Sequence, residues 1–475
     1  MELVRDVPVR KSKITVGFKG LANSTDQSLA DMTYAKTVHN FAFEKGVLTG
    51  GIGIDSAEGY YPDPYIERHA YPPLPEGRTF RNVFLYRRKA ENSAYGDRLV
   101  AHMDNYRFMY TSVFAPDEWH EIPDLMINDD VTAVNYNYNG HDVLLLSAKD
   151  NDLFMIQEGT AFVCGNAPMF TSIEVHGERV FGSINGAQNQ VWFSDDFNPI
   201  NWSVSATEAG FINFADECGD ILKLVSFLGY LYIFREGGIF RLTAIGDQSE
   251  FMLKKMFTDT GRIVKDSIEL CGDKIIFYSD TGLFAFDGYE VTRIGSELPD
   301  IFRTRIMDCA YLDDCYYMAC RTESDGDENN TVIRYGLKDK TLSVLFGYSV
   351  KKLRTVKTHN AAQVLCITGG DTLGAMSESG KVMGAVTDKS YLSPENALGS
   401  PYVKTVRSAT FQSDKDITLS VILDGKSYDY PVKGSPHLRT VPIERSGRKI
   451  GFKISCNSAE AYVTPLIVAV DALKI

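Results

Sequence analysis

The chain has 475 residues, of which 44% are hydrophobic and 23% charged, and its formal net charge is −13. This composition is typical of a soluble globular protein with a sizeable core, and the acidic balance argues against a surface that grips double-stranded DNA through clustered Lys and Arg. A channel through which nucleic acid slides without sticking is not excluded. We expect neither a signal peptide nor a transmembrane helix, because the N-terminus lacks an apolar region and no stretch approaches 18 apolar residues.

Residues 1–77 differ in pattern from the rest of the chain. Short runs with β character, 13–18 and 37–43, are followed by the glycine-rich segment 46–53. The next segment, 60–75, contains five prolines and can form neither a helix nor a central strand. We therefore expect 1–77 to be an extended N-terminal arm that packs on the repeats that follow it or on another subunit.

Residues 78–390 repeat one pattern, in which an apolar strand, a tight polar turn and a second apolar strand follow each other. The spacing of about 36 to 50 residues is that of one four-stranded propeller blade. Gly, Asn and Asp in the turns suit β-hairpins. The seven turns are Asp104-Asn105, Asp150-Asn151, Asn185-Gly186, Glu236–Gly238, Asp280–Gly282, Ser324–Gly326 and Thr368–Gly370.

This repeat predicts an all-β fold built on a β-propeller of about seven blades. The sequence leaves six, seven or eight blades open. Strands from the C-terminal region could complete the last blade, or the N-terminal arm could contribute to the first.

The pattern changes again in residues 391–475. An apolar run, 417–423, turns at Asp424-Gly425, and further alternating runs follow at 450–455 and 466–470. Alternation around an Asp-Gly hairpin predicts a small antiparallel β-sandwich.

The eight cysteines show no Cys-x-x-Cys pair, and no Cys/His cluster has the spacing of zinc ligands. Most of them lie in apolar runs, so we expect reduced, buried core residues of a protein assembled in a cytoplasm. The sequence predicts no cofactor and no metal site.

Ser194–Trp202 is the segment that most suggests an enzyme. It is close to the Asp-box of sialidases, Ser-x-Asp-x-Gly-x-Thr-Trp, with Asn198 in place of the glycine and the tryptophan one residue late. The Asp-box is a structural turn in which the aspartate satisfies turn amides and the tryptophan packs between strands. We therefore expect a structural role here and no catalytic residue.

Two acidic segments, 325–329 and 150–152, offer oxygen ligands for calcium, but neither has the spacing of an EF-hand. Adjacent carboxylates such as Asp129-Asp130 point to opposite faces of a strand, so they do not form a glycosidase pair. The sequence also lacks a phosphate-binding loop and a nucleophile elbow. These observations favour a protein that is not an enzyme.

Three segments together resemble structural proteins of bacteriophage virions. His39–Gly53 is similar to the N-x-x-x-x-x-G-x-L-x-x-R-x-G opening of tail-tube and nozzle-type proteins, although the basic residue before the last glycine is absent. Arg179–Trp202 is similar to a blade of phage virion propellers. Gly447–Ile454 resembles the G-R-x-I-G-F-x-I strand of the packaged-DNA stabilisation proteins, or tail hubs, of short-tailed phages.

The resemblance implies a non-enzymatic virion protein of the tail or connector, assembled in the bacterial host cytoplasm. Such a hub, nozzle or stabilisation ring forms a homo-oligomer below the portal, retains the packaged genome and passes it during ejection. Its expected partners are the portal or adaptor, the tail tube or the fibres, with transient contact to phage DNA. The departures from the motifs leave open which ring this is, or whether it is a baseplate or fibre-adaptor component.

In this hypothesis the arm adds strands to a neighbouring subunit, where main-chain hydrogen bonds supply affinity. The side chains expected at the assembly interface are Ile14, Val16, Phe18, Phe41 and Phe43. Deletion of residues 1–55 is then expected to leave a folded monomer that fails to assemble.

The alternative is a carbohydrate-binding or sialidase-like propeller. It would use the mouth of the central channel and exposed aromatic residues such as Trp119 and Tyr106. A cellular scaffold of the WD type is disfavoured, because the G-H…W-D signature is missing from every repeat.

Overall fold

The structure is a computed structural model of the chain. It describes residues 9–21, 31–59, 68–75, 77–89, 96–186, 189–204, 208–256, 261–295, 305–321, 329–358 and 361–473. In these ranges the fold is almost entirely β, with two short 3₁₀ turns, η1 (Gln248–Glu250) and η2 (Lys265–Ser267). No helix among the described residues has the length and apolar character needed to cross a membrane.

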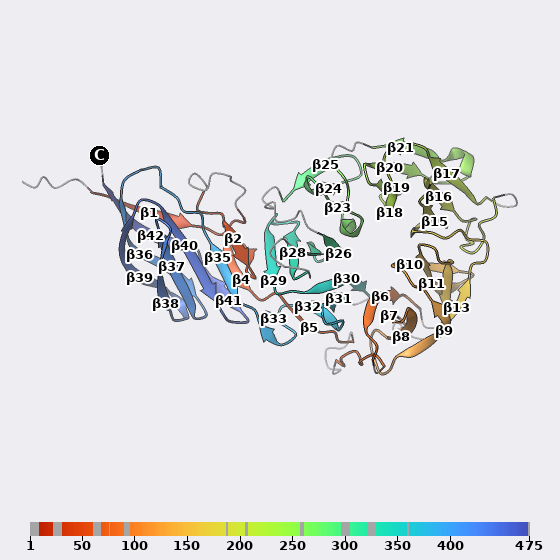
Figure 1. Cartoon of the computed structure of the whole chain (residues 1–475), viewed down its shortest axis with the longest axis horizontal. Coiled ribbons are helices and arrows are strands. Elements are labelled where there is room, and N and C mark those ends of the chain that lie inside the picture. The colour runs from red at the N-terminus through yellow and green to blue at the C-terminus, as the bar shows by residue number, and fades with distance from the viewer. Residues whose placement is uncertain are drawn as a thin grey trace, which may run out of the picture.

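A β-propeller and a β-sandwich lie side by side in the structure (Figure 1). Six blades are antiparallel four-stranded sheets of consecutive strands. Blade 1 consists of β6 (Phe80–Tyr86), β7 (Arg98–Met103), β8 (Arg107–Ser112) and β9 (His120–Met126). Blade 2 consists of β10 (Val131–Tyr138), β11 (His141–Ala148), β12 (Phe154–Gln157) and β13 (Thr160–Val163). Blade 3 consists of β14 (Ser172–His176), β15 (Arg179–Ile184), β16 (Asn189–Phe193) and β17 (Gly210–Phe214).

Blades 4 to 6 follow the same order around the ring. They consist of β18 (Ile221–Phe227), β19 (Tyr230–Arg235), β20 (Gly238–Thr243) and β21 (Met252–Lys255); β22 (Glu269–Cys271), β23 (Lys274–Ser279), β24 (Gly282–Phe286) and β25 (Val291–Ile294); and β26 (Ile306–Leu312), β27 (Cys315–Cys320), β28 (Thr331–Gly336) and β29 (Leu342–Phe346).

The seventh blade closes the ring with a strand from the N-terminal region. Its three consecutive strands are β30 (Val350–Lys357), β31 (Ala362–Thr368) and β32 (Leu373–Ser377). β5 (Gly53–Ser56) pairs antiparallel with β32, from Ser56 opposite Gly374 to Gly53 opposite Ser377. The short strands β33 (Lys381–Val382) and β34 (Ala385–Val386) extend this sheet. The described residues therefore form a seven-bladed propeller, as the repeat predicts.

Apolar clusters fill the junctions between neighbouring blades, and the cluster between blades 5 and 6 is continuous with the core of the sandwich. Between blades 2 and 3, for example, Leu145 and Val180 pack with Phe170 and Trp202, all of them fully or almost fully buried. Comparable clusters fill the other junctions of the ring. The ring is thus stabilised by the burial of apolar area at every blade junction.

The sandwich takes strands from both ends of the chain. One sheet contains β1 (Val9–Val16), β42 (Leu466–Leu473), β36 (Lys404–Ser413), β41 (Ala461–Val463), β4 (Val47–Gly50) and β3 (Ala42–Glu44), with β39 (Ser435–Gly447) paired to β36. The other sheet contains β2 (Thr37–His39), β35 (Lys389–Leu392), β40 (Ile450–Cys456), β37 (Ile417–Leu423) and β38 (Lys426–Val432). β1 pairs with β42 along its whole length, from Val9 opposite Leu473 to Val16 opposite Leu466.

The N-terminal segment is consequently not a separate extended arm. Its first four strands belong to the sandwich and its fifth to the propeller, so the segment joins the two modules. At the junction, Asn40 donates its backbone N–H to Val344 O (2.9 Å) and its side-chain Nδ2 to Asp388 O (2.7 Å). The Asn40 Oδ1 atom accepts from the Phe346 amide (2.7 Å), which fixes the sandwich against blade 6.

All eight cysteines are buried and unpaired in the structure, as the sequence predicts. Burial raises the pKa of Cys164 and of Cys366 to about 12, so these thiols stay protonated at neutral pH.

Candidate functional site

The five side chains expected at an assembly interface lie in the sandwich itself. Val16, Phe18, Phe41 and Phe43 are each at most 1% exposed, and Ile14 is half-buried against the same core. Phe18 packs edge-on against Tyr391 with ring centroids 4.9 Å apart. Their expected role therefore needs correction, because in this structure the chain's own C-terminal strands cover the surface that a neighbouring subunit would need.

The Asp-box-like segment forms a structural turn, as predicted. Asp195 accepts hydrogen bonds from the Glu208 amide (3.2 Å) and from Asn201 Nδ2 (3.4 Å). Trp202 is 2% exposed, packs on Phe170 at 4.7 Å and donates its indole N–H to Pro199 O (3.0 Å). The Asp195 carboxylate and the Trp202 side chain therefore stabilise the turn and the packing around it.

The aromatic residues considered for carbohydrate binding divide between core and surface. Trp119 is 9% exposed, and its indole N–H donates to Pro72 O (2.8 Å), so its expected exposure is wrong. Tyr106 is 37% exposed, with the Arg81 guanidinium 5.2 Å from its ring centre.

Of the two segments considered for calcium binding, 150–152 lies within the described residues and 325–329 lies almost wholly outside them. Residues 325–328 lie outside the described part of the chain. Around Asp150 and Asp152, as elsewhere among the described residues, no group of three or more His, Cys, Asp or Glu side chains is arranged to hold a metal ion.

The central channel of the propeller is lined by the innermost strands of all seven blades. A cavity of about 380 Å³ lies along it, with charged side chains of both signs on its wall. Lys223 Nζ lies 3.3 Å from Glu269 Oε2, and Arg354 Nη1 lies 2.5 Å from Asp308 Oδ2. Both ion pairs link neighbouring blades, so they help to hold the ring closed.

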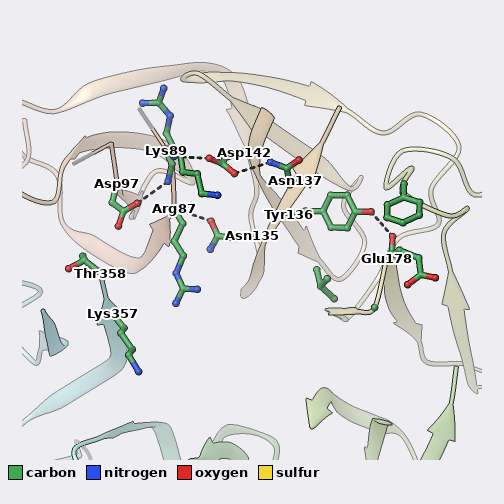
Figure 2. A pocket seen from close by; sticks show the side chains of 14 residues that line it. Arg87, Lys89, Asp97, Asn135, Tyr136, Asn137, Asp142, Glu178, Lys357 and Thr358 are labelled. Atoms are coloured by element: carbon green, nitrogen blue, oxygen red, sulfur yellow. Dashed lines mark hydrogen bonds between the residues drawn. The ribbon is translucent and has the colours of Figure 1, made fainter. Parts of the chain in front are cut away.

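A larger cavity, of about 1000 Å³, opens where β6, β10, β14 and β30 end (Figure 2). The residues that line it come mainly from the ends of these four innermost strands. They are Arg87, Arg88, Lys89, Asp97, Asn135, Tyr136, Asn137, Asp142, Val175, Gly177, Glu178, Phe197, Lys357 and Thr358. We call this cavity the channel mouth.

Side-chain acceptors hold the backbone of residues 87–89 at the channel mouth. The Arg87 amide donates to Asn135 Oδ1 (2.8 Å), the Arg88 amide to Asp97 Oδ1 (2.9 Å) and the Lys89 amide to Asp142 Oδ2 (2.7 Å). These bonds direct Asn135, Asp97 and Asp142 to the main chain, leaving the cationic heads of Arg87 and Lys89 to the cavity.

The cations of the channel mouth differ in their partners. Arg88 forms an ion pair with Glu158, whereas among the described residues no carboxylate lies within ion-pair distance of Arg87, Lys89 or Lys357. These three side chains are exposed. Figure 2 shows Arg87 and Lys357 extending into the same space, with Glu178 across it.

Tyr136 and Phe197 form the wall beside Glu178. The Tyr136 hydroxyl donates to Glu178 O (2.5 Å), and the Phe197 amide donates to the same carbonyl (3.1 Å). Burial raises the pKa of Tyr136 to about 12, so this donor remains protonated at neutral pH. The Phe197 ring is 72% exposed.

The carbohydrate-binding alternative named the mouth of the central channel, but neither of the aromatic residues that it offered, Trp119 and Tyr106, lines this cavity. Arg87-Arg88-Lys89 is a basic triplet directly after the apolar residues Val83–Tyr86, and that signal was present in the sequence. Nothing local connects it to Lys357, which only the closure of the ring brings to the same cavity.

No protein-family model matches the chain, and no curated protein matches its sequence. Among solved structures, the chain is similar to BBS1N in its complex with ARL6DN, with 10% identity and a TM-score of 0.40 over 60% of this chain and 87% of that chain. It is also similar to the Neurospora crassa Pan2 WD40 domain, with 11% identity and a TM-score of 0.40 over 71% of this chain and 97% of that chain. These values do not bear on what the chain binds.

Proposed function

We propose that the protein is a non-enzymatic structural protein of a bacteriophage virion, located in the tail or connector. Copies assemble as a ring that retains the packaged genome and passes it during ejection. The observation that supports this proposal most is that the three segments resembling virion proteins all have structural roles in this fold. All three build or join the two modules.

In the first segment, the matching positions have structural roles. Asn40 joins the sandwich to blade 6 by the three hydrogen bonds described above. Gly46 adopts a φ of +81° in the tight turn between β3 and β4, a conformation that glycine enters without steric cost. Leu48 is fully buried in the sandwich.

The segment Gly447–Ile454 is equally structural. A Cβ atom on Gly447 would lie 2.9 Å from the Leu423 Cβ, so the strands meet closely there. Asp424 accepts from the Arg448 amide (3.0 Å) and the Lys449 amide (2.9 Å). The buried ammonium of Lys404 donates to the Arg448 carbonyl (2.8 Å), which closes the turn from the other side.

In this proposal the genome passes through the space at the centre of a ring of several copies and not through the propeller. The propeller's own channel holds a cavity of about 380 Å³ between packed strands, with ion pairs between neighbouring blades on its wall.

In this proposal, contrary to the expectation from the sequence, the contacts between subunits of the ring do not come from strands of the N-terminal segment. Because β1 to β4 are paired within the chain, the subunit contacts in this proposal come from the outer surfaces of the sandwich and the propeller. Free strand edges of the sandwich, at β38 and β39, are candidates. Pro436 and Pro442 in β39 disfavour strand addition there, because proline lacks the amide donor.

Quantitative mass spectrometry of density-purified phage particles from the source culture tests the proposal. The chain is counted against the portal protein, and we expect a fixed ratio that matches a ring. Host ribosomal proteins, counted in the same sample, report contamination. Absence of the chain from particles, or a ratio that varies between preparations, contradicts the proposal.

A further inference from the structure

Phe197 is held at the channel mouth in a backbone conformation that bulky residues rarely adopt. Its φ is +52°, in the left-handed region, and its amide is tied to the Glu178 carbonyl (3.1 Å). The result is an apolar ring that is 72% exposed on the wall of a polar cavity. Strained backbone of this kind persists where the surroundings over-determine it, and it is concentrated at ligand sites.

The opposite wall carries three cationic side chains that have no carboxylate at ion-pair distance among the residues described. Arg87, Lys89 and Lys357 are exposed there, and their neighbouring carboxylates Asp97 and Asp142 accept from backbone amides. A guanidinium group presents several donors in a fixed fork that fits a carboxylate. This wall is therefore complementary to an anionic group.

Hydrogen-bond acceptors lie among these donors. Glu178 lies across the cavity from Arg87 and is part of its lining (Figure 2). Asn137 uses its amide nitrogen to donate to Asp142 Oδ1 (3.1 Å), which leaves its oxygen to a ligand. A ligand that fits has one carboxylate for the cations, hydroxyl groups for both donors and acceptors, and an apolar face for the Phe197 ring.

The geometry points to a binding site for an acidic oligosaccharide, a sugar chain that carries one uronate or sialate carboxylate. The site is additional to the proposed structural role and does not depend on it. Sugar rings present weakly positive C–H groups on one face, and the negative face of an aromatic ring attracts them.

Other anionic ligands fit less well. A nucleic-acid strand carries a charge at every phosphate, so beyond the three cations its charges would meet the carboxylates of Asp97, Asp142 and Glu178, whereas a sugar chain with one carboxylate avoids them. A peptide is typically anchored by a side chain that fills a hole, whereas here the aromatic ring belongs to the protein and protrudes. Acidic peptides and nucleic acids are therefore controls in the test.

Isothermal titration calorimetry on the full chain tests the inference with matched ligands. The probes are cellobiouronic acid with cellobiose, and sialyllactose with lactose, because the acidic member of each pair carries a single carboxylate and its partner carries none. We expect at least one acidic member to bind about tenfold or more tightly than its neutral partner. An oligoglutamate peptide and a single-stranded DNA oligomer are titrated under the same conditions.

Three variants locate the binding. Arg87→Gln and Lys357→Gln remove charge, and Phe197→Gly removes the ring while suiting a positive φ; each is expected to weaken the acidic sugar about tenfold. Lys254→Gln, exposed on β21, is the matched control and is expected to bind as the wild type does. Thermal unfolding confirms that each variant is folded.

Several results overturn the inference. They are no binding of either acidic sugar at millimolar concentration, equal binding of acidic and neutral partners, tighter binding of the peptide or the DNA, or unchanged binding by the folded Arg87→Gln and Phe197→Gly variants. Failure here leaves the count of the chain in phage particles unaffected, so the two proposals are distinguishable.

Discussion

Glu174 places an ionisable carboxyl on the channel wall, on the innermost strand of blade 3. Burial raises its pKa to about 7, although the Val175 amide (3.0 Å) and the nearby Lys223 ammonium favour the charged form. Loss of water around the carboxylate therefore outweighs the attraction to its neighbours. At neutral pH the ring holds a carboxyl group that is close to half-protonated.

This shift makes the stability of the ring depend on pH. The pKa of Glu174 is about 7 in the folded chain and 4.5 in the reference state, so between these values the folded state binds more protons. Stability contributed by this group is therefore present below pH 4.5 and lost as the pH rises through 7. We expect Glu174→Gln to unfold like the wild type at pH 4, where both states hold the proton, and to be more stable at pH 8, by about 1–2 kcal/mol after screening by channel water.

Thermal unfolding across this pH range measures the difference between the two proteins. Glu217→Gln, on an exposed loop of the propeller, is the control and is expected to show no growing difference. A Glu174→Gln variant that is less stable than the wild type at pH 8 would show that the carboxylate contributes favourable interactions that exceed its desolvation.

At the scale of elements, Asn40 joins β2 and β3 of the sandwich to β29 of the propeller. Its φ of +60° suits asparagine, and its side chain bridges the Phe346 amide and the Asp388 carbonyl. Replacement by alanine removes the side-chain amide, so the Phe346 amide and the Asp388 carbonyl both lose this hydrogen-bond partner. We expect Asn40→Ala to reduce the free energy of unfolding by about 3 kcal/mol.

Asn139 provides a matched control, because it also has a positive φ, of +52°, but is exposed in the turn between β10 and β11. Asn139→Ala is expected to cost only about 1 kcal/mol, the price of the left-handed conformation. Hydrogen exchange separates the two effects, since Asn40→Ala should accelerate exchange of the Phe346 amide. Equal destabilisation by both variants would contradict a junction role for Asn40.

The propeller could be predicted because its signals are local. Hairpins such as β19–β20 and β23–β24 are recognisable from a Gly or Asp turn between two apolar runs. The Asp-box-like turn was recognisable in the same way, because Asp195 and Trp202 are close in sequence. The sheet that each N-terminal strand joins could not be predicted, because its partner strands are far away in the sequence. Val9 pairs with Leu473 and Gly53 with Ser377, and a strand pattern does not encode which distant edge it meets. The same reason hid which residues line the channel mouth, because its walls meet only after ring closure.

For the molecule as a whole, the N-terminal segment is a shared structural part of both modules. Removal of residues 1–55 takes away β1 to β4 and most of β5, which opens the sandwich core and blade 7. The lost side chains include Val16, Phe18, Phe41 and Phe43, all buried. At about 1.5–3 kcal/mol for each, their burial is comparable to the entire stability of a domain.

The truncated chain is therefore expected to lose cooperative unfolding and to aggregate, in contrast to the folded monomer that an extended arm would leave behind. Circular dichroism during heating, with size-exclusion chromatography, measures both properties. A shorter truncation that removes residues 1–8 is the control, because it retains every strand the structure describes. A soluble Δ1–55 chain that unfolds cooperatively near the wild-type temperature would show that the two modules fold without this segment, and would restore the arm as a candidate for contacts between subunits.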